Sequence, residues 1–271
     1  MSSGRSNRSK SVPWWDSAYE DPMIVGTMFG WKKQGADLEV DAILRKVRLK
    51  PGSRILDLAC GAGRHSLEFS RRGYQVVGLD YSDLLLRKAK AAARKVPQNL
   101  RPQFVHGDMR EVGALLPKAS FDLVLSLWNA WGYFDDPRDD FRVLSGISRV
   151  LKPGGRVLIN TLNLGGVKHA VRGGARRRWL EEGKDRIFLD EFAYDSKSRK
   201  AHAGWYWVSR KKGLLKQLQF QQNVYSPEDF GKQFKRVGIK TENLWGLLDG
   251  SPYTETSWHQ TIVGRKTQDI R

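Results

Sequence analysis

The sequence predicts an α/β fold in which a mostly parallel sheet is covered by helices on both faces. Between residues 54 and 160, short apolar runs alternate with amphipathic stretches, which is the pattern of repeated βαβ units. A glycine-rich turn follows the first apolar run directly, as expected where a strand turns sharply into a helix. The chain has 271 residues, 40% of them hydrophobic, and is therefore long enough to bury such a sheet.

Five strands and three helices are expected in this region, in alternating order. The strands are predicted at residues 54–58, 75–79, 102–106, 121–127 and 155–160, and the helices at 65–72, 83–94 and 137–151. Ser82 and Asp83 provide an N-terminal cap for the second of these helices. Upstream, residues 38–49 are predicted to form an amphipathic helix that ends at the Pro51-Gly52 turn.

The segment before that helix is unusually aromatic, with Trp14, Trp15, Tyr19, Phe29 and Trp31. Together with the helix it is expected to form a helical arm over residues 13–50. The arm is predicted to pack on the sheet, and a lid that covers a ligand is the alternative, which is compatible with such packing. The residues before it, 1–12, are expected to be a disordered basic tail.

The hydrophobic pattern changes after the fifth strand, so the central unit is expected to cover residues 51–164. Beyond it, turn-like breaks separate strand-like runs and predict an antiparallel β insertion over residues 165–225. The runs lie at 186–194, 201–209 and 214–225.

The last part of the chain, residues 226–271, is expected to complete the core sheet. Ser226 and Pro227 start a helix, because serine caps the N-terminus and proline suits the first helical position, and Gly238 ends it. Two last strands are predicted near 240–247 and 260–266.

The charge balance is the unusual feature of the composition. There are 47 Lys and Arg residues against 29 Asp and Glu, a formal net charge of +18. Such a balance favours acidic partners, with RNA, DNA, anionic lipid surfaces and acidic small molecules as candidates. It is equally compatible with charge that serves only solubility.

Cysteine content and hydropathy limit the classes of protein to which the chain can belong. The single cysteine, Cys60, excludes a disulfide framework and a cysteine-based zinc site within one chain, and no metal site is expected. The first residues lack the apolar stretch of a secretory signal, and no apolar run approaches the ~18 residues that a membrane span needs. We therefore expect a soluble, cytoplasmic protein without a membrane partner.

The strongest motif is the run from Asp57 to Ser66, directly after the first predicted strand. Gly61 and Gly63 suit a backbone that turns sharply, approaches a ligand closely and starts a helix whose free N–H groups point at that ligand. The second strand ends at Asp80, where a carboxylate accepts hydrogen bonds from a ribose diol. By itself this pattern fits a nicotinamide dehydrogenase and a methyltransferase equally well.

The third strand separates these two classes. It leads into Asp108, a second acid on the same sheet edge, where an adenine amino group can donate to it. Asp57, Asp80 and Asp108 thus all fall at or near the carboxyl ends of predicted strands. Three carboxylates around one site suit a sulfonium ligand better than a pyrophosphate, which they would repel.

The motifs taken together resemble class I S-adenosylmethionine-dependent methyltransferases, in particular a bacterial methyltransferase-domain subgroup of the small-molecule type. The resemblance covers roughly residues 38–266 and implies a Rossmann-like, seven-stranded, mostly parallel sheet with helices on both faces, plus the antiparallel β insertion after strand five. It is carried by Ile55–Ser66, Val76–Ser82, Gly107–Met109, Phe121–Leu125, Trp128–Phe134, Leu151–Leu158, Asp249–Tyr253 and Gln260–Lys266.

The resemblance implies that the chain binds S-adenosylmethionine. Gly61 and Gly63 would face the methionine part, with Asp57 near its amino group. Asp80, with Tyr81 beside it, would bind the ribose hydroxyls. Ala59 is also expected in this site; it stands where the family usually has the first glycine of the run, and alanine is the mildest replacement.

The resemblance assigns the remaining site residues to two later segments. Asp108 and the backbone of Met109 would hold the adenine. Trp128 and Asn129, just after strand four, would flank the sulfonium and the acceptor.

Catalysis is expected to depend mainly on positioning, because an in-line methyl transfer needs two reactants held close and aligned. Tyr133 and Asn129 are the candidate catalytic residues, and aromatic faces near them can stabilise a sulfonium charge. A general base is needed only where the acceptor is protonated at the working pH. The histidine candidates for that role are His65, His169, His202 and His259.

The acceptor remains open at this stage. A small molecule, methylated on nitrogen, on oxygen or on carbon, is the preferred acceptor, with the insertion shaping its pocket. RNA or protein is the alternative, because the insertion interleaves Lys and Arg with Trp179, Trp205, Tyr206 and Trp207. A protein that binds S-adenosylmethionine without catalysis is a third hypothesis, and a monomer and a homodimer are both compatible with the sequence.

Overall fold

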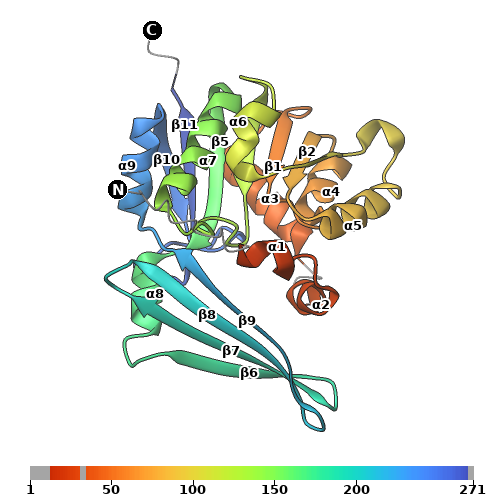
Figure 1. The fold of residues 1–271 in the computed structure, drawn as a ribbon. Helices are drawn as coiled ribbons and strands as arrows, with labels where there is room; N and C mark the ends of the chain where they lie inside the picture. Colours follow the sequence, from red (N-terminus) through yellow and green to blue (C-terminus); the bar gives the residue numbers. More distant parts are fainter. Residues whose placement is uncertain (1–12, 31–34, 268–271) are drawn as a thin grey trace, which may run out of the picture.

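The structure is a computed structural model that describes residues 13–30 and 35–267 (Figure 1). The predicted basic tail, residues 1–12, and Trp31 lie outside the described residues. A seven-stranded sheet forms the body of the molecule, with strand order β10-β11-β5-β4-β1-β2-β3. Its strands are β1 (Arg54–Leu58), β2 (Gln75–Asp80), β3 (Gln103–His106), β4 (Phe121–Ser126), β5 (Leu151–Leu162), β10 (Ile239–Trp245) and β11 (His259–Lys266).

Strands β1 to β5 run parallel to one another, and β11 is antiparallel to both β5 and β10. Because β1 lies between β2 and β4, the strand order reverses there, and the carboxyl ends of these strands frame a crevice. The expected Rossmann-like, mostly parallel fold is therefore confirmed.

Helices cover both faces of this sheet, as alternate side chains on each strand require. They are α3 (Ala36–Val47), α4 (Arg64–Arg71), α5 (Asp83–Ala93), α6 (Val112–Leu115), α7 (Pro137–Val150) and α9 (Pro227–Arg236). A further helix, α8 (Leu164–Ala170), follows β5 and packs through Val167 against Ala201 of the insertion. On β1, Leu56 belongs to the core cluster that includes residues of α7 and α9. Ile55, the preceding residue, belongs to the cluster that includes residues of α3 and α4.

The predicted helix signals are confirmed at the two places where they were most specific. Ser82 accepts a hydrogen bond from the backbone N–H of Leu85 and caps α5. Ser226 and Asp229 form a reciprocal capping box at the start of α9. Gly238 follows the end of that helix with φ of 70°, a conformation that favours glycine.

The insertion is a separate four-stranded antiparallel sheet with strand order β6-β7-β8-β9 (Figure 1). Its strands are β6 (Arg176–Glu182), β7 (Arg186–Asp195), β8 (Lys200–Ser209) and β9 (Gly213–Asn223). One face packs on the helical arm, where Phe188 and Trp207 bury against Ala18 and Ile24. The antiparallel insertion after strand five is therefore confirmed.

One strand of this sheet was not predicted. The Arg-rich residues 176–182, which precede the three predicted runs, form the edge strand β6, which pairs with β7 along its full length. The side chains of β6 are almost all exposed, so the segment carries no alternation of apolar and polar residues that could identify it.

The helical arm begins with α1 (Trp14–Ala18) and α2 (Pro22–Gly30), which lie between the two sheets (Figure 1). Trp14 stacks on Phe220 of β9 at 4.6 Å between ring centroids, and Trp15 meets Phe134 edge to face at 5.4 Å. The first two helices of the arm thus pack against the insertion and the loop after β4, whereas only α3 packs on the large sheet, where the whole arm was expected. Within the described ranges, none of the helices is long and apolar enough to cross a membrane.

Candidate active site

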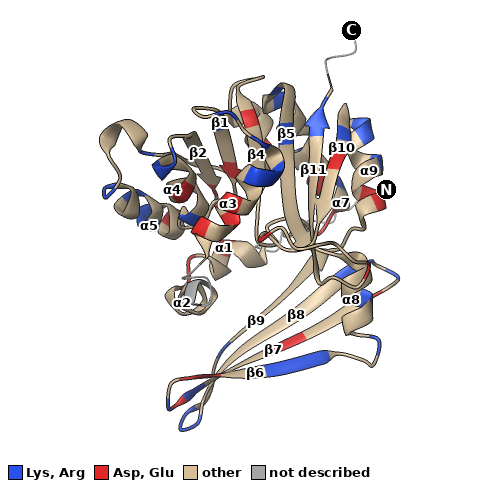
Figure 2. Cartoon of the chain, turned by 180° about the vertical axis from the view of Figure 1, so that it is seen from behind, with Lys and Arg blue, Asp and Glu red and all other residues tan. Residues whose placement is uncertain are grey.

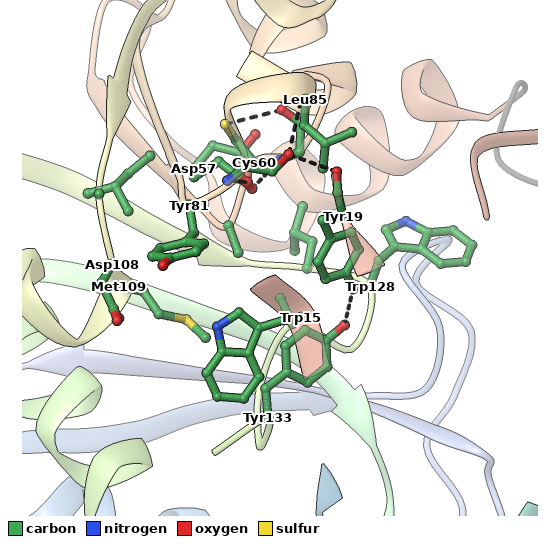
Figure 3. Close-up of a pocket in the computed structure, with 18 of the residues that line it drawn as sticks. Trp15, Tyr19, Asp57, Cys60, Tyr81, Leu85, Asp108, Met109, Trp128 and Tyr133 are labelled. Carbon is green, nitrogen blue, oxygen red and sulfur yellow. Dashed lines mark hydrogen bonds between the residues drawn. The ribbon is translucent and has the colours of Figure 1, made fainter. Parts of the chain in front are cut away.

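A pocket opens at the carboxyl ends of β1, β2, β3 and β4, where the strand order reverses (Figure 3). The loop after β1 contributes its floor, and Trp15 and Tyr19 of the arm close it from the opposite side. The arm therefore packs on neighbouring elements and also contributes to the wall of a cavity. Most of the predicted cofactor residues line this pocket: Asp57, Ala59, Gly61, Asp80, Tyr81, Asp108, Met109 and Trp128.

Asp80 is held by the backbone around it. Its carboxylate accepts hydrogen bonds from the N–H of Gly61 at 2.7 Å and of Ser82 at 2.9 Å. Burial raises the pKa of Asp80 to about 6, although these two N–H donors act in the opposite direction. The fixed carboxylate keeps lone pairs that can accept hydrogen bonds from a ligand in the pocket.

Asp57 is the more deeply placed acid. Ser66, in the first turn of α4, donates a hydrogen bond to its carboxylate at 2.6 Å. Burial raises the pKa of Asp57, against the lowering effects of the His65 charge and the Ser66 hydrogen bond. The glycine-rich turn thus places two acids, Asp57 and Asp80, on one side of the pocket.

A charged network that was not predicted closes the end of the pocket near α3. One oxygen of Glu39 accepts hydrogen bonds from Arg64 at 2.8 Å and from Trp128 Nε1 at 3.3 Å, and lies 2.6 Å from His65 Nε2. Burial alone would raise the pKa of Glu39, but the hydrogen bond and charge of His65 and the charge of Arg64 outweigh it and lower that pKa.

Arg64 is only partly satisfied by this network. Its guanidinium lies 5.2 Å from the centre of the Trp128 ring, and its Nη2 binds Glu39. Its Nη1 atom is buried and has no hydrogen-bond partner within the described part of the chain. Because a buried N–H donor without a partner is costly, Nη1 is placed to bind an acceptor group on a ligand.

Asp108 lies at the far side of the pocket and is already engaged. Both of its oxygens accept hydrogen bonds from Arg110, through the backbone N–H at 2.8 Å and through Nε at 2.9 Å. Arg110 also reaches Asp139 at 3.2 Å. The charge of Asp108 is therefore balanced within the protein, so an adenine contact at this position has to share the carboxylate with Arg110.

The backbone around the pocket adopts conformations that L-residues avoid. Ala59, Trp128 and Asn129 have φ of 56°, 56° and 63°, in the left-handed region that costs most non-glycine residues roughly 1–2 kcal/mol. Trp128 and Asn129 are consecutive, and this turn directs the Trp128 indole toward Glu39. Backbone strain of this kind clusters at functional sites.

Two tyrosines stand where this pocket meets a second one. Tyr19 and Tyr133 point their hydroxyls toward one another, 2.9 Å apart (Figure 3). Burial raises the pKa of Tyr133 to about 12, and burial together with Tyr133 raises that of Tyr19 well above its ordinary value. Both hydroxyls are therefore protonated at neutral pH.

The second pocket lies between the arm, the loop after β4 and the inner face of the insertion. It has a volume of about 500 Å³ and shares Tyr19, Met28, Trp128 and Tyr133 with the first pocket. Its walls are mainly aromatic: Trp14, Phe192, Trp205, Phe220 and Trp258. Its polar lining consists of the two tyrosines with Asn129, Arg176, Arg178, Asp190, Gln222 and His259. Among these, the carboxylate of Asp190 is held by Arg178 at 2.6 Å and by Trp205 Nε1 at 3.0 Å.

Two predicted site residues lie outside the first pocket. Asn129 lines the second pocket, where its amide lies 3.1 Å from Nε2 of His259. Gly63 lines neither pocket; a Cβ there would meet Phe104 at 2.9 Å, so this glycine permits close packing of α4.

Several lining residues were not among the predicted site residues, notably Cys60, Arg64 and Met28. Cys60 and Arg64 fall within the glycine-rich motif, so position in that motif could have identified them. Met28 and the network partner Glu39 lie in the arm and α3, and nothing in the local sequence indicates that they reach the site.

The basic insertion carries much of its charge in ion pairs. On β6, Arg177 and Arg178 pair with Glu191 and Asp190 of β7. Further pairs join Arg199 to Asp229, Arg210 to Glu181 and Lys216 to Asp21. Figure 2 shows the Lys and Arg positions spread over strands and loops of both sheets. The positive charge available to a polyanion on the insertion is correspondingly smaller than the sequence indicates.

Comparison with known proteins finds a matching family for the central part of the chain. Residues 55–155 match the family described as the methyltransferase domain. The ribosomal protein L11 methyltransferase of Thermus thermophilus is 31% identical over 120 residues, which cover 42% of this chain and 44% of that protein. This chain spans less than half the length of the curated relatives that it matches first.

Two solved structures share the architecture over nearly the whole chain. The CcbJ methyltransferase of Streptomyces caelestis has a TM-score of 0.77, at 17% identity, covering 93% of this chain and 99% of that chain. CalS10 of Micromonospora echinaspora, an amino pentose methyltransferase solved with S-adenosylmethionine bound, has a TM-score of 0.65, at 17% identity, covering 90% and 97%.

The match of residues 55–155 to the methyltransferase-domain family bears out the resemblance to class I S-adenosylmethionine-dependent methyltransferases. For this segment the match favours the methyltransferase interpretation of the glycine-rich motif over the dehydrogenase interpretation.

Proposed function

We propose that this chain is an S-adenosylmethionine-dependent methyltransferase that acts on a small-molecule acceptor, at a nitrogen or oxygen atom, with carbon as a third option. The observation that carries the proposal is the shared boundary of the two pockets. Tyr19, Met28, Trp128 and Tyr133 line both, so a cofactor in the first and an acceptor in the second would meet at these side chains.

The residues of the first pocket fit S-adenosylmethionine. Nη1 of Arg64 is a buried donor without a partner among the described residues, which suits the carboxylate of an amino acid. Asp57 suits an amino group, and Asp80 suits a ribose diol. Asp108, shared with Arg110, would lie beside the adenine.

When bound, S-adenosylmethionine supplies a methyl group on a cationic sulfur. The protein's own part is to hold the two reactants in line, because fixing them ~3 Å apart can lower the barrier by several kcal/mol. The faces of Trp128 and Tyr133 at the boundary can stabilise a nearby cation by ~0.5–2 kcal/mol. The Tyr19 and Tyr133 hydroxyls, protonated and bonded to one another, act as fixed dipoles rather than as bases.

Removal of a proton from the acceptor would fall to a side chain of the second pocket. His259 lies there beside Asn129, with 3.1 Å between His259 Nε2 and Asn129 Nδ2. A neutral amine needs no base before it attacks, whereas a hydroxyl does. Of the four candidate histidines, His259 alone lines the second pocket; His65 lines the first and is bonded to Glu39.

The aromatic walls of the second pocket favour a compact organic acceptor over a polymer. Docking of RNA or protein on the basic insertion remains the alternative, and the curated relatives include a methyltransferase named for a ribosomal protein. The pairing of Arg177, Arg178, Arg199 and Arg210 with acids weighs against it. A non-catalytic protein that binds S-adenosylmethionine is the third hypothesis.

Transfer of label from methyl-tritiated S-adenosylmethionine into a host extract tests the proposal, after separation into RNA, protein and small-molecule fractions. We expect label in the small-molecule fraction. An Asp80→Ala enzyme serves as the blank. Trp205→Ala should lose transfer while keeping cofactor affinity. The matched control is Tyr206→Ala, one residue further on the same strand, which lines neither pocket.

The other outcomes decide between the alternatives. Label in RNA or protein would overturn the small-molecule acceptor, and salt-sensitive RNA binding would support docking through phosphate contacts. Cofactor binding without label in any fraction would favour the non-catalytic hypothesis.

A further inference from the structure

The edge strand β6 has features that the proposed function does not use. It pairs with β7 on one side only, so the backbone N–H and C=O groups on its outer side have no strand to pair with among the described residues. Its side chains are exposed over nearly the whole strand, and Figure 1 shows it at the rim of the insertion, remote from the large sheet. Such an edge invites pairing with another strand.

The charges of β6 are separated along the strand. The sequence runs Arg176-Arg177-Arg178-Trp179-Leu180-Glu181-Glu182, with three cations before the centre and two anions after it. When this strand meets a second copy of itself in antiparallel orientation, centred on Trp179, Arg177 lies opposite Glu181 of the partner subunit. Each such pair occurs twice, because the arrangement has a two-fold axis. A parallel arrangement would instead place Arg residues next to one another.

Apolar exposure on the same strand points to the same partner. Trp179 is 68% exposed and Leu180 is 40% exposed, and both are large hydrophobic residues at the centre of β6. Leu214 and Leu215 are also exposed, but they lie at the start of β9, at the opposite edge of this sheet, and take no part in the β6 pairing.

From these observations we infer that the chain forms a homodimer in which two β6 strands pair antiparallel and join the two insertion sheets into one continuous sheet. Trp179 lies at the two-fold axis, next to the partner's Trp179. Opposite charges on directly opposed residues stabilise an antiparallel pair, and like charges destabilise it. The charge pattern therefore fixes the orientation and the register as well as the partner.

The pairing has a consequence for the second pocket. Arg176 and Arg178, on the inner face of β6, line that pocket, whereas Arg177 and Glu181 line neither pocket. In the dimer, Arg178 lies opposite the partner's Leu180, so the second subunit would border the rim of the pocket. The inference itself does not depend on the proposed function, because it concerns residues outside the cofactor site.

Charge reversal on β6 tests the dimer, with the oligomeric state measured by sedimentation velocity over a wide concentration range. The wild type is expected to dimerise. Arg177→Glu alone opposes Glu to Glu, and Glu181→Arg alone opposes Arg to Arg, so each should weaken dimerisation by at least about tenfold. An equimolar mixture of the two single variants should form a mixed dimer, because every opposed pair in it is again Arg with Glu.

The mixing result separates β6 pairing from other contacts. Each substitution also removes an ion pair inside the chain, of Arg177 with Glu191 or of Arg210 with Glu181, but that loss cannot be repaired by a second molecule. Circular dichroism and cofactor binding by calorimetry verify that each variant is folded. A wild type that is monomeric at every concentration would overturn the inference. Dimerisation of both charge-reversal variants as strong as that of the wild type would overturn it as well.

Discussion

The hydroxyls of Tyr19 and Tyr133 lie 2.9 Å apart and form a hydrogen bond at the boundary between the two pockets. The two residues are 114 positions apart in the chain, so the contact fastens the helical arm to the loop after β4. Further contacts hold the arm in the same place, since the carbonyl of Tyr19 and the carboxylate of Glu20 both accept a hydrogen bond from Ser82.

Loss of either hydroxyl should lower turnover without changing its pH dependence. Tyr133→Phe and Tyr19→Phe each leave the other hydroxyl without its partner, which costs roughly 1–3 kcal/mol of stability when the group is buried. Because the pKa of Tyr133 is raised to about 12, its hydroxyl supplies no base at neutral pH. Initial rates across a pH series check this, and a rate limb that disappears in Tyr133→Phe would establish an acid–base role.

The pKa of Asp80 makes a prediction about pH and stability. In the folded, cofactor-free protein it is about 6, above the ordinary 3.8. Between these values the folded state binds more protons than the unfolded chain, so this group stabilises the fold in acid, and that contribution is lost as the pH rises through about 6. Asp140, with a pKa also raised to about 6 by burial, acts in the same window from outside the pocket.

Urea unfolding of wild type and Asp80→Ala at a series of pH values measures this contribution. As the pH falls from neutral, the unfolding free energy of the wild type should rise relative to that of Asp80→Ala by roughly 1–3 kcal/mol. Affinity for S-adenosylmethionine should fall below about pH 6, as Asp80 becomes protonated. A difference that is flat with pH would contradict the raised pKa.

The unpartnered Nη1 of Arg64 predicts a specific loss of cofactor affinity. Arg64→Gln removes the donor and should weaken S-adenosylmethionine binding by roughly 1.5–3 kcal/mol, the usual value of a hydrogen bond to a charged group. Arg72→Gln is the matched control, because Arg72 pairs with Asp41 and Glu68 and lies outside the pocket.

Decarboxylated S-adenosylmethionine identifies the group that Arg64 binds. In calorimetry the wild type should bind this analogue more weakly than the normal cofactor, whereas Arg64→Gln should bind the two alike. Equal discrimination by both proteins would show that Arg64 does not bind the carboxylate.

Replacing Ala59 by glycine should make the protein more stable. Its φ of 56° costs an alanine roughly 1–2 kcal/mol, and glycine's greater freedom in the unfolded chain returns part of that gain. We therefore expect Ala59→Gly to raise the free energy of unfolding by about 0.5–1 kcal/mol, measured by urea denaturation. Ala119→Gly, at φ of 51° and away from both pockets, should give a similar gain. A destabilised Ala59→Gly would mean that the Ala59 methyl group packs in the site.

The large sheet could be predicted because its signals are local. Each strand and each glycine-rich turn is encoded within about ten residues, and the predicted β1 bounds agree with the observed Arg54–Leu58. The acids at strand ends followed from the same rule, since parallel strands bring their carboxyl ends to one edge. Asp57, Asp80 and Asp108 all line one pocket as a result.

The insertion was predicted less completely, for a physical reason. Strands β7, β8 and β9 show apolar residues that bury on one face, whereas β6 is exposed on both faces and is defined only by its backbone pairing with β7. Pairing of this kind leaves no trace in the hydrophobic pattern, so the sequence indicated a basic segment and not a strand.

The sequence by itself determined the fold class, the cofactor motif and the two strand-end acids that follow it. The tertiary structure decided which distant residues complete the site. Glu39 meets Trp128 across 89 positions and Tyr19 meets Tyr133 across 114, and in each case the contact exists only because helices and loops dock on the same sheet edge. Packing also decided that Asp108 shares its charge with Arg110 and that Gly63 serves the helix contact instead of the pocket. Local patterns specify elements, whereas the geometry of a site arises when those elements pack.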